Sequence, residues 1–378
     1  MATIRDVAAK AKVSVATVSR VLNDSGYADS ETRVRVLKAA ADLSYRRNVN
    51  WSRLKSQSSQ TILFLLGNRQ SVNSFQMRLL VACEKALQAR GYDLIFSRYE
   101  YSGRLRATEL PLPRMLDQTG ALDGVLLAGV HHPNLLQVLD KRGMPYSLLG
   151  NNFEGPTPHN SVLYDDCAGV EEATGYLIRL GHRRIAFLGN VTLPWFQRRY
   201  RGYRQAMEKN GIAPIPIGCD WQVTDTDYGQ LATAQLLREA RPPTAILAGN
   251  DELAAGAWKE LTKRKIAIPK DMSLIGLGDR PEFAILEPAL SSISVFVDQL
   301  GERLTAMLLK RIEDPTHLPA SETYPCKLIE RASCAPLAVV TTLLAPQAPL
   351  NLPHPVPKIL PARRLARQLR ELRPRPLQ

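Results

Sequence analysis

The hydrophobic positions at the beginning of the chain recur with the period of an α-helix. They stand at i, i+3, i+4 and i+7, and therefore share one face of a short helix. These positions are Ile4, Val7, Ala8 and Ala11. Thr3 stands where an N-cap is needed, and Asp6 follows it at the spacing of a capping box.

Two more helices are predicted in the same segment. Ser14 offers an N-cap for a helix over residues 15–22, and Ser30 offers an N-cap for a third helix that runs to about residue 44. The residues expected to face inward are Val18, Val21 and Leu22 on the second helix, and Val34, Leu37 and Ala41 on the third. The pattern predicts an all-α unit of three short helices.

From residue 61 the pattern changes to short apolar runs that alternate with amphipathic segments. Such runs are typical of buried strands, and the longer segments have the period of helices. The predicted strands are residues 62–66, 94–96, 125–127, 146–149, 162–163, 185–188, 245–247 and 274–275. The predicted helices are residues 75–89, 134–141, 168–180, 200–209, 228–238 and 253–263. Repeated units of this kind favour an α/β core of two doubly wound parallel-sheet lobes over residues 61–335.

The end of the chain has a different composition. Residues 336–378 contain nine prolines, and a segment of that composition does not form a packed core. We predict a disordered basic tail there. The alternative is a single basic helix over residues 362–373 that oligomerises or touches DNA.

Charge adds to this picture. Residues 1–60 hold 11 basic against 5 acidic residues, the tail holds 7 against 1, and the residues between hold 31 against 30. A basic head on a nearly neutral core is typical of a nucleic-acid reader joined to another function.

The chain shows neither a signal peptide nor an apolar run approaching the ~20 residues of a membrane helix, so we expect a cytoplasmic protein with no membrane partner. The five cysteines lack the spacing of metal ligands.

The first two predicted helices form a helix-turn-helix, whose second helix can enter the major groove of DNA. Its exposed face carries small residues and one long donor, which suits close approach to base edges. These residues are Val15, Ala16, Thr17, Ser19 and Arg20. The alternative interpretation is a small helical hairpin with a solvated basic face.

Residues 6–23 read D-V-A-x-x-A-x-V-S-x-x-T-V-S-R-V-L-N, which resembles the DNA-binding headpiece of the lactose-repressor (LacI/GalR) family of transcription regulators. The likeness continues to about residue 336. It implies a headpiece over residues 1–47, a hinge helix and linker over residues 48–60, and a core similar to periplasmic sugar-binding proteins. The further candidate DNA contacts are Thr3, Ser14, Asn23, Tyr27, Thr32, Asn48 and Leu54.

The hinge of that family has the pattern Y-x-P-N-x-x-A-R-x-L, and its leucine enters the minor groove. The resemblance makes Leu54 the expected wedge between base steps. The chain matches the pattern at Tyr45, Asn48 and Leu54, and departs from it at Arg47, Trp51 and Ser52.

Polar residues follow the predicted strands of the core, at the ends where open parallel sheets bind ligands. Amides, carboxylates and an arginine can hydrogen-bond a polyhydroxylated molecule while an aromatic ring covers its apolar face. The resemblance implies effector contacts from Arg199 in R-x-x-G-Y, Asn250 in G-N-D, and Trp221. The candidate effector residues are Arg69, Asn73, Phe75, Trp195, Arg199, Trp221, Asn250 and Asp279. For each of them alone, a helix cap or loop residue is the competing interpretation.

One motif of the core departs from the family. Residues 273–279 read S-L-I-G-L-G-D where the family has S-x-x-G-F-D-D, so Gly278 replaces its ligand-binding aspartate and Asp279 is the expected substitute. A sugar or sugar derivative is the expected effector, and Arg69 also admits an acidic one. A regulator that has lost effector control is the alternative function.

Enzyme signatures are missing from the sequence: it contains no G-x-G-x-x-G after a strand, no P-loop, no H-E-x-x-H and no G-x-S-x-G. We therefore predict no catalytic residues, no cofactor and no metal. The sequence predicts a homodimeric transcription regulator, a repressor, that reads a pseudo-palindromic operator in double-stranded DNA under control of a small molecule. Tetramer formation is left open.

Overall fold

The computed structural model describes residues 2–22, 28–43, 58–69, 72–153, 160–215, 223–318 and 320–337. The chain divides into two compact units, Met1–Ser59 and Gln60–Gln378. This boundary coincides with the end of the predicted hinge and linker, most of which lies outside the described residues. Among the described residues, no helix combines the length and apolar character needed to cross a membrane.

The described part of the first unit consists of three helices, α1 (Ile4–Ala11), α2 (Val15–Leu22) and α3 (Ser30–Asp42). Thr3 and Asp6 form the predicted capping box at the start of α1. Ser14 begins α2, because its Oγ accepts a hydrogen bond of 3.0 Å from the backbone N–H of Thr17. These two caps fix where the helices of the helix-turn-helix begin.

The third helix buries a different face from the predicted one. Val34 and Leu37 are 64% and 49% exposed, whereas Val36 and Ala39 are buried against the other two helices. Apolar residues stand on both faces of α3, so the helical period alone could not select the buried face. The predicted N-cap is also wrong by one residue, because the side chain of Asp29 caps the helix.

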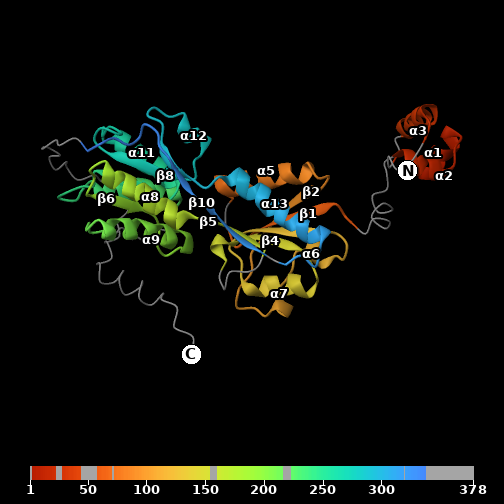
Figure 1. The fold of residues 1–378 in the computed structure, drawn as a ribbon, viewed down its shortest axis with the longest axis horizontal. Coiled ribbons are helices and arrows are strands. Elements are labelled where there is room, and N and C mark those ends of the chain that lie inside the picture. Colours follow the sequence, from red (N-terminus) through yellow and green to blue (C-terminus); the bar gives the residue numbers. More distant parts are fainter. Residues whose placement is uncertain are drawn as a thin grey trace. The chain divides into compact units, whose positions relative to one another are not determined.

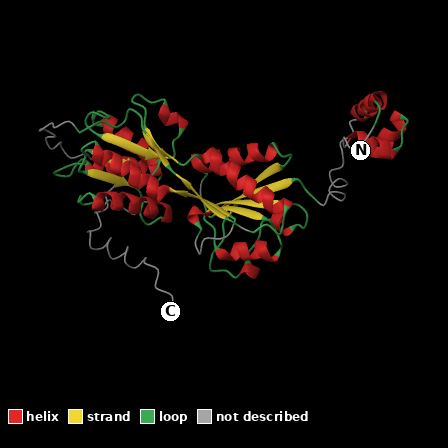
Figure 2. Ribbon diagram, viewed as in Figure 1, coloured by secondary structure: helices red, strands yellow, loops and turns green. Residues whose placement is uncertain are grey.

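The second unit contains two sheets with helices on both faces (Figure 1 and Figure 2). The first has the order β10-β5-β4-β3-β1-β2, and the second has the order β11-β9-β8-β7-β6. All neighbouring strands are parallel except β11 and β9. The strands of the first sheet are β1 (Thr61–Gly67), β2 (Asp93–Tyr99), β3 (Gly124–Gly129), β4 (Tyr146–Leu149), β5 (Ser161–Asp165) and β10 (Ser321–Pro325). Those of the second are β6 (Ile185–Leu188), β7 (Ala245–Ala248), β8 (Ser273–Leu277), β9 (Ser291–Ser294) and β11 (Lys327–Ile329).

Each sheet and its helices form one lobe, as the alternating pattern predicts. The helices of the first lobe are α5 (Ser74–Gln88), α6 (Arg114–Asp117), α7 (Pro133–Lys141) and α13 (Val297–Glu313). Those of the second lobe are α8 (Asp166–Arg179), α9 (Pro194–Lys209), α10 (Asp225–Leu236), α11 (Asp251–Lys263) and α12 (Pro281–Ala284). Short 3₁₀ turns occupy Ala107–Glu109 and Gly150–Asn152. The described core continues through Leu337, whose N–H donates to the carbonyl of Leu180 at 2.8 Å.

The chain passes between the lobes three times within the described residues. It crosses from β5 to α8, returns from β9 to α13, and crosses again from β10 to β11. As a result α13, late in the sequence, lies beside α5 of the first lobe (Figure 1). Neither lobe is a continuous segment, so the crossings hold the two lobes together.

Two glycines let α10 and α11 approach closely in the second lobe. A Cβ atom on Gly229 would overlap the carbonyl oxygen of Leu253, and a Cβ on Gly256 would overlap that of Thr226. Gly256 belongs to the motif G-N-D-x-x-A-x-G. The close approach brings the N-termini of both helices to the same edge of the sheet.

We expect Gly256→Ala to lower the free energy of unfolding by about 1–3 kcal/mol, because the added methyl overpacks this helix pair. Urea unfolding followed by circular dichroism measures the change. The matched control is Gly175→Ala in α8, where the nearest atom to a Cβ is the end of the flexible Arg179 side chain at 3.5 Å. There the better helix former should add about 0.5–1 kcal/mol. Equal stability of the two variants would contradict the packing argument.

Candidate functional site

The exposed face of α2 is the candidate DNA interface. Val15, Ala16 and Arg20 are exposed, and Thr17 and Ser19 are partly exposed. Val15 is 41% exposed, which is unfavourable for a valine in water and suits contact with a thymine methyl group. The face therefore offers apolar contact, small side chains and one guanidinium at the same surface.

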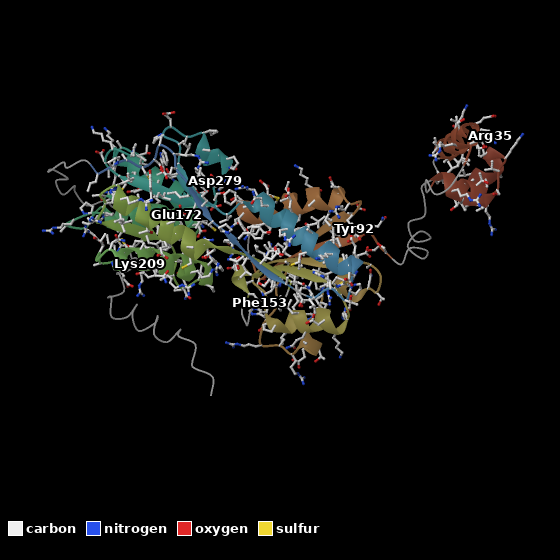
Figure 3. The ribbon with its side chains drawn as sticks, viewed as in Figure 1. Arg35, Tyr92, Phe153, Glu172, Lys209 and Asp279 are labelled. Atoms are coloured by element: carbon white, nitrogen blue, oxygen red, sulfur yellow. The ribbon has the colours of Figure 1, made fainter. Side chains whose placement is uncertain are left out.

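The other predicted DNA contacts are placed differently. Thr3 and Ser14 are exposed and cap the two helices, so both stand at helix N-termini, which favour phosphate. Thr32 is buried, and its hydroxyl accepts a hydrogen bond of 3.1 Å from Arg35, so its side chain is not presented for contact with DNA. Figure 3 labels Arg35 on this helical unit. The remaining candidates Asn23, Tyr27, Asn48 and Leu54 lie outside the described residues.

A cleft of about 1080 Å³ lies between the two lobes of the second unit. It is lined by the ends of strands from both sheets and by the first turns of α5, α9, α10 and α11. Six predicted effector residues are brought together there: Arg69, Asn73, Phe75, Trp195, Arg199 and Asn250. Trp221 lies outside the described residues.

Asp279 was predicted to be an effector contact, but it does not line the cleft with these six residues. Its backbone takes a left-handed φ of 50°. Its carboxylate instead accepts a hydrogen bond of 2.6 Å from Arg331, which follows β11. Figure 3 labels Asp279 on the second lobe. The residues on either side, Gly278 and Arg280, reach the cleft in its place.

Arg199 is held in a buried network at the base of the cleft. Its Nε donates to Asp166 at 3.0 Å, and its Nη1 donates to the carbonyl of Gly249 at 2.7 Å. Asp166, only 1% exposed, also receives two hydrogen bonds from Arg198, at 3.1 and 3.2 Å. Burial opposes the charge of Arg199, but the Asp166 carboxylate and Tyr164 together outweigh it and raise the pKa of the guanidinium. Arg199 therefore stays charged and fixed in orientation.

Asn250 serves as a helix cap and lines the cleft as well. Its Oδ1 accepts from the N–H of Leu253 at 2.8 Å, and its Nδ2 donates to Asp225 at 2.7 Å. Burial raises the pKa of Asp225, and the hydrogen bond from Asn250 works in the opposite direction. Asn73 likewise caps α5 and lines the cleft. Capping and a cleft position are thus compatible in these residues.

Sequence reasoning missed several polar residues that line the cleft. They are Arg78, Tyr164, Asp225, Glu252 and Arg280. Glu252 directly follows the G-N-D motif, so the sequence could have indicated that it lines the cleft. Arg78 and Arg280 carry no motif, because only the packing of the two lobes brings them to the site.

Arg78 and Glu252 join the two lobes at the rim of the cleft. Arg78 of α5 donates to the carbonyls of Gly278 and Asp279, at 2.9 and 3.2 Å. Ser74 donates to Glu252 at 3.0 Å, and Arg280 donates to the same carboxylate at 3.1 Å. We call these contacts the interlobe clasp.

Gly278 has a specific part in the clasp. Its φ is 132°, a conformation that residues with a side chain rarely adopt. An aspartate at this position would be strained in this backbone, and its Cβ would lie 3.2 Å from the buried carboxylate of Asp251. The loss of the family's aspartate therefore accompanies a backbone contact to the opposite lobe.

We expect Arg78→Ala to loosen the clasp and to raise the radius of gyration of the ligand-free protein in small-angle X-ray scattering, because two hydrogen bonds between the lobes are lost. Arg90→Ala removes the same charge from an exposed position just beyond α5 and should leave the scattering unchanged. Identical scattering curves for both variants and the wild type would show that the clasp does not hold the lobes.

A helix-turn-helix with an exposed reading face and a two-lobed α/β receptor with a polar cleft together define a DNA-binding regulator with a small-molecule receptor core. Comparison with known proteins agrees. Residues 3–48 match the family described as bacterial regulatory proteins, lacI family, and residues 174–334 match the periplasmic binding protein-like domain. The chain belongs to the LacI family. It is a DNA-binding transcriptional regulator and not an enzyme.

Two relatives and one solved structure illustrate the likeness. The chain is 28% identical to the HTH-type transcriptional repressor CytR of Escherichia coli K12, over 88% of this chain and 96% of the relative. It is 32% identical to the ribose operon repressor of Bacillus subtilis 168, over 85% of this chain and 94% of the relative. The Lac repressor dimer bound to operator and the anti-inducer ONPF superimposes with a TM-score of 0.74 at 25% identity, covering 88% of this chain and 99% of the other.

Proposed function

We propose that this protein is a cytoplasmic repressor that binds a pseudo-palindromic operator as a dimer, and that a sugar or sugar derivative bound between its lobes controls its operator affinity. The observation that carries the proposal is the polar cleft, because it gathers six predicted effector residues from both lobes. The similar Lac repressor structure, a dimer bound to operator and an anti-inducer, supports the same assignment.

A dimer surface is available on the first lobe. Met77 and Val81 stand one turn apart on α5 and are exposed, and Phe96 is exposed on β2, which is an edge strand. Exposed apolar side chains that gather on neighbouring elements favour a protein partner. A second copy of the chain fits this surface, because a two-fold axis would pair it with itself and would also match the symmetry of the operator.

Effector control requires a difference between two forms of the core. A ligand changes operator affinity only through its different affinity for the two lobe arrangements. The hinge and linker precede β1 directly in the sequence, so movement of the first lobe acts on the segment that leads to the headpiece. The interlobe clasp favours one arrangement without a ligand.

We expect Arg20→Ala to weaken operator binding by about 1–3 kcal/mol, because the exposed guanidinium of α2 contacts a guanine or a phosphate. Fluorescence anisotropy with operator DNA and with scrambled DNA measures the change. Arg90→Ala, which removes the same charge from the core, should bind operator as the wild type does. If Arg20→Ala also binds operator normally, α2 is not the reading helix.

We expect Arg199→Lys to abolish most of the effector response while operator binding without effector is retained. A lysine keeps the charge beside Asp166 but lacks the further guanidinium N–H groups that remain for a ligand beside the bonds to Asp166 and Gly249. In a ligand-released repressor the variant represses permanently, and in a corepressed one it is permanently derepressed. The measurement is operator affinity with and without effector, for the wild type and for Arg199→Lys. A full response in the variant would place Arg199 outside the effector site, and no response in the wild type would favour a regulator without effector control.

A further inference from the structure

Arg69 differs from the other arginines that line the cleft. Among the described residues, Arg199 is bound to Asp166, Arg280 to Glu252, and Arg78 to backbone carbonyls. Within the described ranges, the guanidinium of Arg69 makes no hydrogen bond or ion pair: its side chain contacts the ring of Trp195, and only its backbone carbonyl is hydrogen-bonded. All of its guanidinium N–H groups are therefore left for a ligand.

Arg69 is nevertheless held in place. Its guanidinium carbon lies 4.5 Å from the ring centroid of Trp195, which belongs to the opposite lobe. Its carbonyl accepts a hydrogen bond of 3.0 Å from Arg98. Burial lowers the pKa of Arg69, so the guanidinium has lost part of its water. A desolvated charged group without acceptors is costly, and a ligand that supplies acceptor oxygens recovers that free energy.

The carboxylates around Arg69 are engaged elsewhere. Asp225 is the carboxylate that acts most on its charge, but it is bound by Asn250 and stands in the first turn of α10, where it offsets the positive helix end. Asp166 is shared by Arg198 and Arg199, and Glu252 belongs to the interlobe clasp. Gly278 contributes no side chain. The charge of Arg69 therefore lacks an ion-pair partner within the described part of the cleft.

We propose that the effector is a sugar derivative with an anionic oxygen group, a carboxylate or a phosphate, and that Arg69, stacked on Trp195, is the residue that recognises this group. The inference rests on the proposed effector-controlled function and names the chemical class of the ligand. An anion satisfies both the charge and the forked donors of a guanidinium, whereas a hydroxyl satisfies only the donors. The other polar residues of the cleft remain available to bind the hydroxyl groups of the sugar.

The test uses the full-length protein and sugars in matched pairs, measured by calorimetry and by thermal shift. The probes are D-glucose with D-gluconate, D-glucuronate and D-glucose 6-phosphate, D-galactose with D-galacturonate, and D-ribose with D-ribose 5-phosphate. We expect at least one acidic sugar to bind about tenfold or more tightly than its neutral partner, as a charge-assisted hydrogen bond supplies. The acid and phosphate arms distinguish the two sources of the anion.

Arg69→Gln should remove this preference, Arg69→Lys should keep part of it, and Arg90→Gln should keep all of it. The proposal is overturned if no acidic sugar binds, if neutral sugars bind as tightly in every pair, or if Arg69→Gln retains the preference. Operator binding, measured on the same samples, separates this result from the proposed function. Operator release or capture by a neutral sugar overturns the inference alone, whereas failure to bind any pseudo-palindromic DNA overturns the proposed function.

Discussion

One buried carboxylate links the first crossing between the lobes to the base of the cleft. Asp166 stands at the first crossing between the lobes and binds the guanidinium groups of Arg198 and Arg199. Arg198 also donates to the carbonyl of Asn151 in the first lobe, at 2.5 Å. Removing one partner of such a buried cluster leaves uncompensated charge and costs about 3–5 kcal/mol. The crossing, the base of the cleft and the orientation of Arg199 therefore depend on the same carboxylate.

Strands whose sequences follow a local apolar pattern were predicted correctly. The apolar runs located β1 to β8. Most of these strands are buried on both faces, which requires continuous apolar residues, whereas the edge strand β2 is largely exposed. The apolar pattern was a poor guide to β9, which reads S-S-I-S and is nevertheless buried. Its serines are satisfied by distant partners, since Ser292 donates to Asp251 at 2.7 Å and Ser291 accepts from the N–H of Arg331 at 2.9 Å. Helix α13 was missed as well, although its return to the first lobe is what makes the lobes discontinuous.

The residues of the candidate site divide in the same way, into those predicted from local motifs and those that depend on contacts distant in the sequence. Residues in motifs, such as Arg199 and Asn250, were placed in the cleft by sequence reasoning and lie there. Asp279 was assigned by its neighbourhood in a motif, and its pairing with Arg331 could not be read from the sequence because the two are far apart along the chain. Gly278 was recognised as a departure, but its contact with Arg78 became visible only when the two lobes were placed together.

The three crossings constrain how the lobes can move. The crossings lie next to one another, because β5 pairs with β10, β9 pairs with β11, and β10 leads directly into β11. Three chain segments side by side resist sliding and twisting and leave a rotation about one axis as the easiest motion. The arrangement of the two lobes is then described by a single angle between them. A ligand atom in the cleft, a residue of the rim and a substitution at a crossing all act on that angle, so a change far from the ligand can imitate its presence or absence.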